Sequence, residues 1–244
     1  MKPAPFDYAA PETLEEALDL LAEEDAKALA GGQSLVPLLN FRFARPRLVV
    51  DLNGLAGLDG IRVENGTLFL GALVRQAALE RSAAVAEQWP LLRQAIRFVG
   101  HAQTRTRGTV GGSVAHADPA AELPCVLATL GARFHVRSRR GARVLSAGEL
   151  FVGPLFTSLE PDELLVEIEV PASPANARSA FVEFARTHGD FALAGVALLE
   201  SAEETRIGLL GIAPTPLVVA SLDEADFPDH YLRALVHELL RSIA

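Results

Sequence analysis

Two glycine pairs, each followed within two residues by a serine, constrain this sequence more than any other feature. Gly31-Gly32 comes directly after the short apolar run 26–30, and Gly111-Gly112 lies further along the chain. Glycine lets backbone N–H groups approach an anion closely, and a helix that begins nearby adds positive potential. Ser34 and Ser113 each add a hydroxyl donor. Two such loops can hold a pyrophosphate between them, although either pair alone is also typical of a simple tight turn.

The segments around the first glycine pair predict the order strand, glycine loop, helix, strand. The apolar patterns place the strands at 26–30 and 47–52 and the helix at 34–43. This order is similar to a nucleotide-binding βαβ unit, but it lacks the G-x-G-x-x-G fingerprint of the Rossmann fold. Upstream, Thr13 and Glu16 fit a capping box and predict the start of a short amphipathic helix.

Composition excludes several classes of protein. The chain has 244 residues, 31 acidic and 22 basic side chains and one cysteine, Cys125. One cysteine cannot by itself hold a disulfide framework, a cysteine-rich zinc site or an iron–sulfur cluster. The acidic balance disfavours non-specific binding to nucleic acid. Because no segment has the pattern of a membrane span or a secretory signal, we expect a cytoplasmic protein.

Changes in pattern along the chain predict three domains, at 1–54, 55–172 and 177–244. Asn65-Gly66 between two strand-like runs predicts a hairpin near the start of the second domain. The proline-rich stretch 171–176 is typical of a linker. Beyond it, the pattern predicts three strands, at 180–186, 191–199 and 206–212, and a closing helix at 229–241.

Further short motifs accompany the glycine pairs. In chain order the set is Ala30-Gly31-Gly32-Gln33-Ser34-Leu35-Val36-Pro37, Asp51-Leu52, Gly71-Ala72, Gly108-Thr109-Val110-Gly111-Gly112-Ser113, Ala117-Asp118-Pro119, Glu122-Leu123-Pro124, Glu163-Leu164-Leu165, Gly189-Asp190-Phe191-Ala192 and Gly211-Ile212-Ala213-Pro214-Thr215-Pro216. Together these motifs resemble the FAD-binding (medium) subunit of molybdenum hydroxylases, the carbon monoxide dehydrogenase and xanthine dehydrogenase family. Several motifs in register are far more specific than either glycine pair alone.

The resemblance implies an α+β fold of the vanillyl-alcohol-oxidase-like (PCMH) type, in which two parts bind FAD and a small sheet-plus-helix domain follows. FAD is expected between the first two domains, bound non-covalently, with its flavin ring turned toward the third. The molybdenum cofactor and the iron–sulfur clusters are expected on partner chains only. Those partners are an iron–sulfur small subunit and a molybdenum-cofactor large subunit, assembled as a dimer of heterotrimers.

The resemblance also implies which residues contact the cofactor. These are Leu29, Ala30, Gly31, Gly32, Gln33, Ser34, Leu35, Val36, Gly71, Ala72, Thr109, Val110, Gly111, Gly112, Ser113, Asp118, Glu122 and Leu165. Within this set, Glu122 is expected at the sugar or adenosine end and Leu165 near the adenine. Asp190 and Phe191 are expected beside the flavin ring, where they tune or gate it without a covalent role. No metal ligand is expected in this chain.

The sequence departs from the family in two places. Glu183 occupies the position at which such subunits usually carry a lysine near the flavin. The chain also passes almost directly from Leu222 to Asp229, so the usual helical insert of the third domain is missing.

The function implied is a FAD-binding electron-transfer subunit of an oxidoreductase, which accepts electrons from the iron–sulfur partner and passes them from reduced FAD to an external acceptor. The alternatives are a flavin-free scaffold or docking subunit and a free-standing flavin oxidase. A hydrolytic site of Ser113, His116 and Asp118 is disfavoured, because the sequence around the serine is not a G-x-S-x-G elbow.

Overall fold

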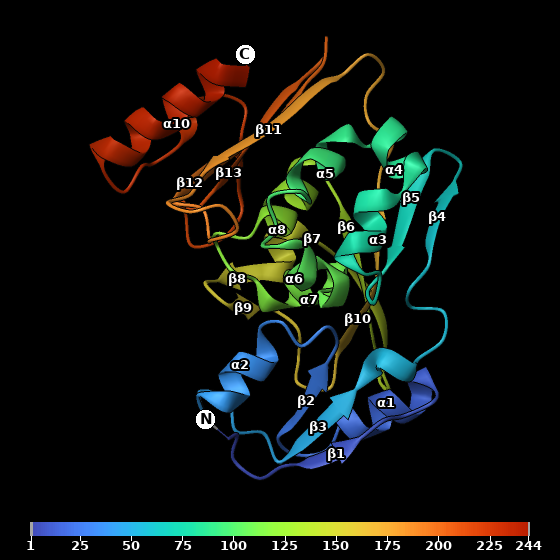
Figure 1. The fold of residues 1–244 in the computed structure, drawn as a ribbon. Coiled ribbons are helices and arrows are strands. Elements are labelled where there is room, and N and C mark those ends of the chain that lie inside the picture. Colours follow the sequence, from blue (N-terminus) through green and yellow to red (C-terminus); the bar gives the residue numbers. More distant parts are fainter. Residues whose placement is uncertain (1, 244) are drawn as a thin grey trace.

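The computed structural model describes residues 2–243, which form three larger sheets and one two-stranded ribbon. We call the larger ones the N-terminal, central and C-terminal sheets, in chain order. The N-terminal sheet lies at the bottom of Figure 1, the central sheet in the middle and the C-terminal sheet at the top.

The N-terminal sheet is parallel and has the strand order β1-β3-β2. Its elements are β1 (Asp7–Ala9), α1 (Leu14–Leu21), β2 (Ala26–Leu29), α2 (Leu35–Asn40), β3 (Leu48–Asp51) and the 3-10 turn η1 (Leu52–Gly54). Helix α1 begins where the sequence predicts it. The Thr13 hydroxyl accepts a hydrogen bond from the N–H of Glu16, and the Glu16 carboxylate accepts one from the N–H of Thr13. The apolar face of α1 packs on β3, which is the buried middle strand.

The central sheet is antiparallel, with the order β4-β5-β10-β6-β7. Its strands are β4 (Ile61–Glu64), β5 (Thr67–Gly71), β6 (Arg133–Ser138), β7 (Gly141–Ser146) and β10 (Leu164–Val170). The predicted hairpin between β4 and β5 is confirmed. Asn65 and Gly66 both have positive φ, 50° and 79°, as a two-residue primed turn requires.

Six short helices lie between β5 and β6 in the sequence. They are α3 (Gln76–Arg81), α4 (Ala83–Gln88), α5 (Pro90–Ala95), α6 (Ala102–Arg107), α7 (Val110–His116) and α8 (Glu122–Thr129). After β7 come α9 (Ala147–Leu150) and the ribbon of β8 (Phe151–Gly153) and β9 (Phe156–Thr157). The largest core cluster joins helices and sheet around Trp89, whose indole N–H donates to the carbonyl oxygen of Pro171 at 2.8 Å.

The C-terminal sheet is antiparallel and is covered on both faces. Its elements are β11 (Arg178–Phe184), β12 (Ala194–Glu200), β13 (Thr205–Leu210), β14 (Leu217–Val219), the turn η2 (Leu222–Glu224) and α10 (His230–Ile243). Phe181 and Leu199 share the central core with α5 and α8, whereas Val196 and Leu198 pack with Val236 of α10. This double burial explains the nearly continuous apolar run of β12. The sequence missed β14, which is short and lies at the sheet edge.

The second glycine pair forms a helix start, not the loop that the sequence predicts. Gly111 and Gly112 lie in the first turn of α7, and Thr109 is its N-cap. The Thr109 hydroxyl accepts a hydrogen bond from the N–H of Gly112 at 3.0 Å. The two glycines are compatible with a helix here because the cap and close packing compensate for their low helix propensity.

Gly208 of β13 marks the tightest contact between the C-terminal sheet and the central helices. A Cβ at this position would collide with the hydroxyl oxygen of Thr129 and lie 3.1 Å from the sulfur of Cys125, both on α8. Gly208→Ala is therefore expected to lower the free energy of unfolding by about 1–3 kcal/mol through overpacking.

Gly148→Ala, in α9, is the matched control, since nothing lies within 4 Å of its Cβ position. It should leave stability unchanged or raise it slightly. Urea unfolding of both variants measures the difference, and equal midpoints would contradict this packing.

Candidate functional site

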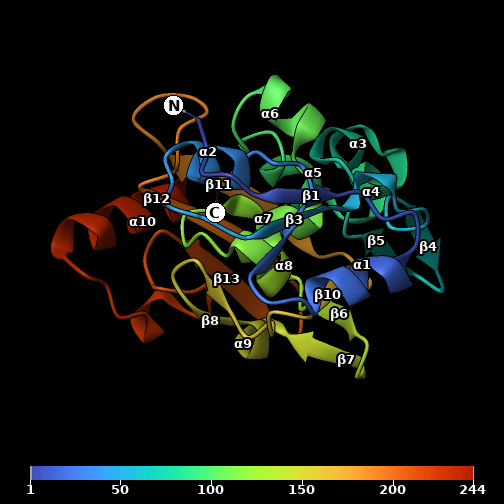
Figure 2. The ribbon, with the colours of Figure 1, turned by 90° about the horizontal axis from the view of Figure 1, so that it is seen from below.

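The carboxyl ends of two parallel strands meet at one edge of the N-terminal sheet. The Gly31-Gly32 pair follows β2. The neighbouring strand β3 ends at Asp51, and Asn53 comes two residues later. The carboxyl edge of parallel strands is where open α/β sheets commonly bind ligands. Figure 2, seen from below, shows this sheet crossing the end of the molecule that carries α6 and α7.

Successive backbone N–H groups after β2 donate to no acceptor among residues 2–243. Within residues 2–243, none is found for the N–H groups of Gly31, Gly32, Gln33 and Ser34. Gly32 has φ 73°, in the left-handed region, and Ser34 is right-handed at φ −100°. Consecutive free N–H groups in such a segment form a concavity that binds anions. The donor set therefore fits the pyrophosphate of a dinucleotide.

The second glycine motif offers far fewer free backbone donors. The N–H groups of Val110 and Gly111 donate to the carbonyl oxygens of Val74 and Ala72, both at 2.9 Å. Those of Gly112 and Ser113 are used within the first turn of α7. A Cβ on Gly111 would lie 2.7 Å from Cα of Ala72, so only glycine fits. The motif fixes α7 tightly against the residues that follow β5.

The two glycine motifs lie against each other. A Cβ on Gly31 would collide with the carbonyl oxygen of Arg107 and lie 2.8 Å from Cα of Gly108. A Cβ on Gly112 would lie 3.8 Å from Cβ of Ala30. The structure thus brings together the segments that the sequence predicts to share a ligand, and the first contact requires a glycine.

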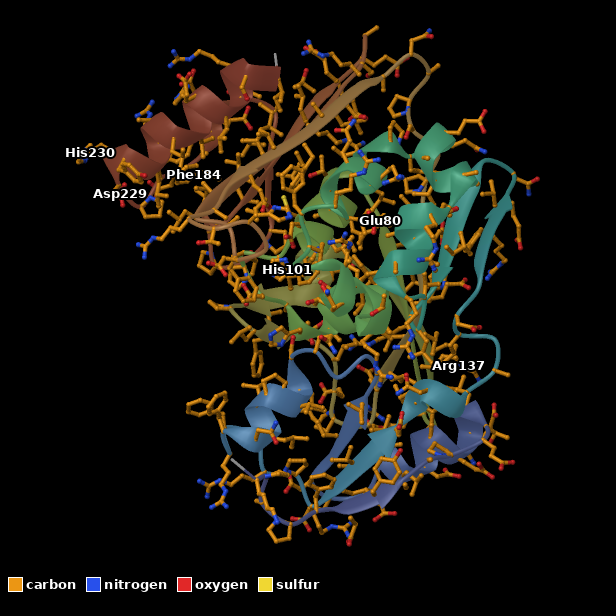
Figure 3. The ribbon with its side chains drawn as sticks, in the orientation of Figure 1. Glu80, His101, Arg137, Phe184, Asp229 and His230 are labelled. Atoms are coloured by element: carbon orange, nitrogen blue, oxygen red, sulfur yellow. The ribbon has the colours of Figure 1, made fainter. Side chains whose placement is uncertain are left out.

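The third predicted segment approaches from the C-terminal sheet. Gly189, in the turn between β11 and β12, has φ 87°, and a Cβ there would collide with the imidazole of His101. Figure 3 shows His101 between the central helices and the C-terminal sheet. In the same turn, Asp190 is exposed and the Phe191 side chain is 67% exposed. This turn therefore contacts His101, the N-cap residue of α6, the helix that ends at Arg107.

The other predicted residues are placed as follows. Leu29 and Ala30 are half-buried at the end of β2, Leu35 is half-buried and Val36 exposed on α2, and Asp118 is half-buried before α8. Gly71, Ala72 and Leu165 are buried, and Leu165 belongs to the core beside β6. The contacts of all these residues with a cofactor remain predictions.

Two carboxyl groups, one buried and one half-buried, lie where α8 meets the C-terminal sheet. Glu122, the first residue of α8, is 7% exposed, and burial raises its pKa to about 8, with Glu183 and Asp118 adding to the effect. Burial also raises the pKa of Glu183 to about 7. Glu183 pairs with Gly195 on the sheet face that packs on the central helices, and its Oε2 is buried without a hydrogen-bond partner. The structure thus brings Glu122 close to Glu183 and the β11–β12 turn.

Sequence patterns missed the polar side chains at the contact between the motifs. Asn53, Arg75 and Arg107 all have atoms in one hydrogen-bonded group there. In the sequence, Asn53 and Gly54 lie at a predicted domain boundary, and Arg107 ends the polar segment 103–107. Arg75 is not part of any recognisable motif.

Neither a metal-binding cluster nor a membrane-spanning helix is found among residues 2–243. Across residues 2–243, no three His, Cys, Asp or Glu side chains gather as a metal site requires. No helix in the same range has the length and apolar character to cross a membrane.

Because Glu122 holds a proton in the folded protein far above its ordinary pKa of 4.5, folding binds protons between about pH 5 and pH 8. The free energy of unfolding should therefore fall as the pH rises through this range. Glu183, whose pKa is raised to about 7, contributes to the lower part of this range, so Glu122→Gln should remove part of the slope there and most of it between about pH 7 and pH 8.

Glu149→Gln serves as the control, since hydrogen bonds from Ser146 lower the pKa of this carboxyl and its titration falls below the window. Urea unfolding at several pH values gives both slopes. A wild-type slope that survives unchanged in Glu122→Gln would contradict the assignment.

Comparison with known proteins places these features in a family. Residues 4–173 match the family described as the FAD binding domain in molybdopterin dehydrogenase. The chain is 42% identical to the 6-hydroxypseudooxynicotine dehydrogenase complex subunit alpha of Paenarthrobacter nicotinovorans, over 100% of this chain and 86% of that protein. It is 45% identical to the caffeine dehydrogenase subunit beta of a Pseudomonas strain, over 92% and 79%.

Solved structures agree. Carbon monoxide dehydrogenase from Hydrogenophaga pseudoflava superposes with a TM-score of 0.87 at 37% identity, covering 94% of this chain and 82% of that one. Quinoline 2-oxidoreductase from Pseudomonas putida 86 superposes with a TM-score of 0.90 at 33% identity, covering 100% and 98%. The resemblance read from the motifs and the PCMH-type α+β fold are both confirmed. The chain belongs to the FAD-binding medium-subunit family of the molybdenum hydroxylases, which are oxidoreductases.

Proposed function

We propose that this chain holds FAD non-covalently between its N-terminal and central sheets and, as one subunit of a molybdenum hydroxylase, transfers electrons from an iron–sulfur partner to an external acceptor. The observation that carries the proposal is the run of unpaired N–H groups from Gly31 to Ser34, pressed against the start of α7. When bound, FAD supplies electron-transfer chemistry that amino-acid side chains lack.

The chain's own residues bind and orient the cofactor. The N–H groups of Gly31 to Ser34 would donate to the pyrophosphate, and Ser113 in α7 would add a hydroxyl. The turn at Gly189 to Phe191, held against His101, borders the flavin end. Glu122, proposed for the sugar or adenosine end, and Glu183 both retain protons up to pH values near or above neutrality.

In this proposal the metal centres lie on partner chains: an iron–sulfur small subunit and a molybdenum large subunit, in a dimer of heterotrimers. The one cysteine of this chain does not compete with that arrangement, because Cys125 is 1% exposed and burial raises the pKa of its thiol to about 12. Several relatives are themselves named as subunits or medium chains of dehydrogenases, which supports this arrangement.

The test is the flavin content of the complex that co-purifies with this chain. The wild type should be yellow, release FAD and not FMN on acid treatment, and bring one cysteine-rich and one molybdenum-containing chain. Gly31→Val should weaken FAD binding roughly tenfold or more, because the side chain forces the two glycine motifs apart.

Gly60→Ala is the control, with nothing within 4 Å of its Cβ position, and should bind FAD like the wild type. A complex that assembles but neither contains nor takes up FAD would show a scaffold subunit instead. Turnover of a small substrate by this chain alone would show a free-standing flavin oxidase.

A further inference from the structure

A chain of hydrogen bonds crosses from the N-terminal sheet to the central helices directly beneath the contact of the glycine motifs. The side-chain amide of Asn53 donates to the carbonyl oxygen of Ala30 at 2.9 Å. Nη2 of Arg75 donates to Oδ1 of Asn53, and Nη1 of Arg75 donates to the carbonyl oxygen of Arg107, both at 2.5 Å. We call these contacts the Arg75 bridge. One guanidinium thus holds the residue before Gly31 and the residue before Gly108 in a fixed relation.

The N-terminal end of the bridge is itself held in place. Asp51, at the end of β3, accepts hydrogen bonds from the backbone N–H of Asn53 at 2.9 Å and from the Tyr8 hydroxyl at 2.6 Å. Burial opposes ionisation of this carboxyl, but the hydrogen bonds from Tyr8 and Asn53 keep the pKa of Asp51 below its ordinary range. Asn53 therefore presents its side-chain oxygen to Arg75 from a rigid support on the sheet edge.

The guanidinium at the centre of the bridge lies near charges of both signs: burial and Arg107 lower the pKa of Arg75 by more than Asp51 and Asp59 raise it. Among residues 2–243, neither Arg75 nor Arg107 has a carboxylate within ion-pair distance. The bridge thus brings the half-buried Arg75 cation to the Arg107 carbonyl oxygen that Gly31 approaches, next to the segment with the free N–H groups. The negative charge of a bound diphosphate would offset the repulsion between Arg75 and Arg107.

We propose that Arg75 is a positioning residue for the dinucleotide: through Asn53 and the Arg107 carbonyl it sets the spacing of the two glycine motifs, and its charge strengthens the anion site that they form. The proposal rests on the proposed function, since it concerns the same cofactor. Geometry and charge make separable contributions, because lysine keeps the charge but cannot donate to both acceptors in the planar manner of arginine.

The experiment measures FAD affinity of the full chain after flavin removal, by the change in flavin fluorescence on titration, at several salt concentrations. Arg75→Met should weaken FAD binding roughly 10- to 100-fold and flatten the dependence of affinity on salt. Arg75→Lys should restore the salt dependence but only part of the affinity. Asn53→Ala should weaken binding and, in the double variant with Arg75→Met, add little more, because both act through one bridge.

Arg139→Ala is the matched control. Arg139, which follows β6, forms an ion pair at 2.8 Å with Asp19 of α1. This pair also links the central and N-terminal parts of the protein, but neither residue belongs to a glycine motif. Arg139→Ala should leave both the affinity and its salt dependence unchanged. The nearby Arg137, which pairs with Glu15 of α1, is visible in Figure 3.

The outcomes separate the two proposals. If the wild type binds FAD and Arg75→Met binds it within twofold, the positioning role is wrong and the proposed function stands. If the flavin-free wild type takes up no FAD, the proposed function fails and the role of Arg75 fails with it. Should Arg75→Met not fold, as judged by its thermal midpoint, Arg75→Lys and Asn53→Ala decide by the same criteria.

Discussion

The contact of the Gly31 backbone with Arg107 and Gly108 is the constraint on which the rest of the structure depends. Because residue 31 is a glycine and has no side chain, the carboxyl edge of the parallel sheet can approach Arg107 and Gly108 closely. Any other residue at this position would collide with that backbone. That approach leaves the N–H groups from Gly31 to Ser34 unpaired at a junction between distant parts of the chain. Unpaired backbone donors are costly unless water or a ligand satisfies them, and this cost supports the proposal that the edge binds a ligand.

The remaining architecture positions the other end of the site. The C-terminal sheet packs on α5 and α8 with one face and on α10 with the other, so the turn at Gly189 is held over His101. The same packing buries Glu122 and Glu183, and desolvation keeps both carboxyl groups protonated well above their ordinary range. The packing of α8 against the C-terminal sheet therefore explains both the position of the turn and the raised pKa values of Glu122 and Glu183.

Much of the fold was predictable because the signals are local. The capping box at Thr13, the Asn65-Gly66 turn and the apolar runs of the strands each depend on a few neighbouring residues, and each forms as predicted. The second glycine motif was predicted less well, because its N–H groups find partners on Ala72 and Val74, which no local pattern reveals. Arg75 was missed for the same reason, since its role arises only from two acceptors brought together in space.

The sequence by itself determined the family and the class of ligand, because motifs in register and a single cysteine are properties of the chain order alone. Only the tertiary structure decided which donors are free. Whether an N–H group has an acceptor depends on its neighbours in space. Two glycine motifs that are similar in sequence therefore differ in structure. Among residues 2–243, the N–H groups of the first motif have no acceptor, whereas those of the second are used to anchor a helix.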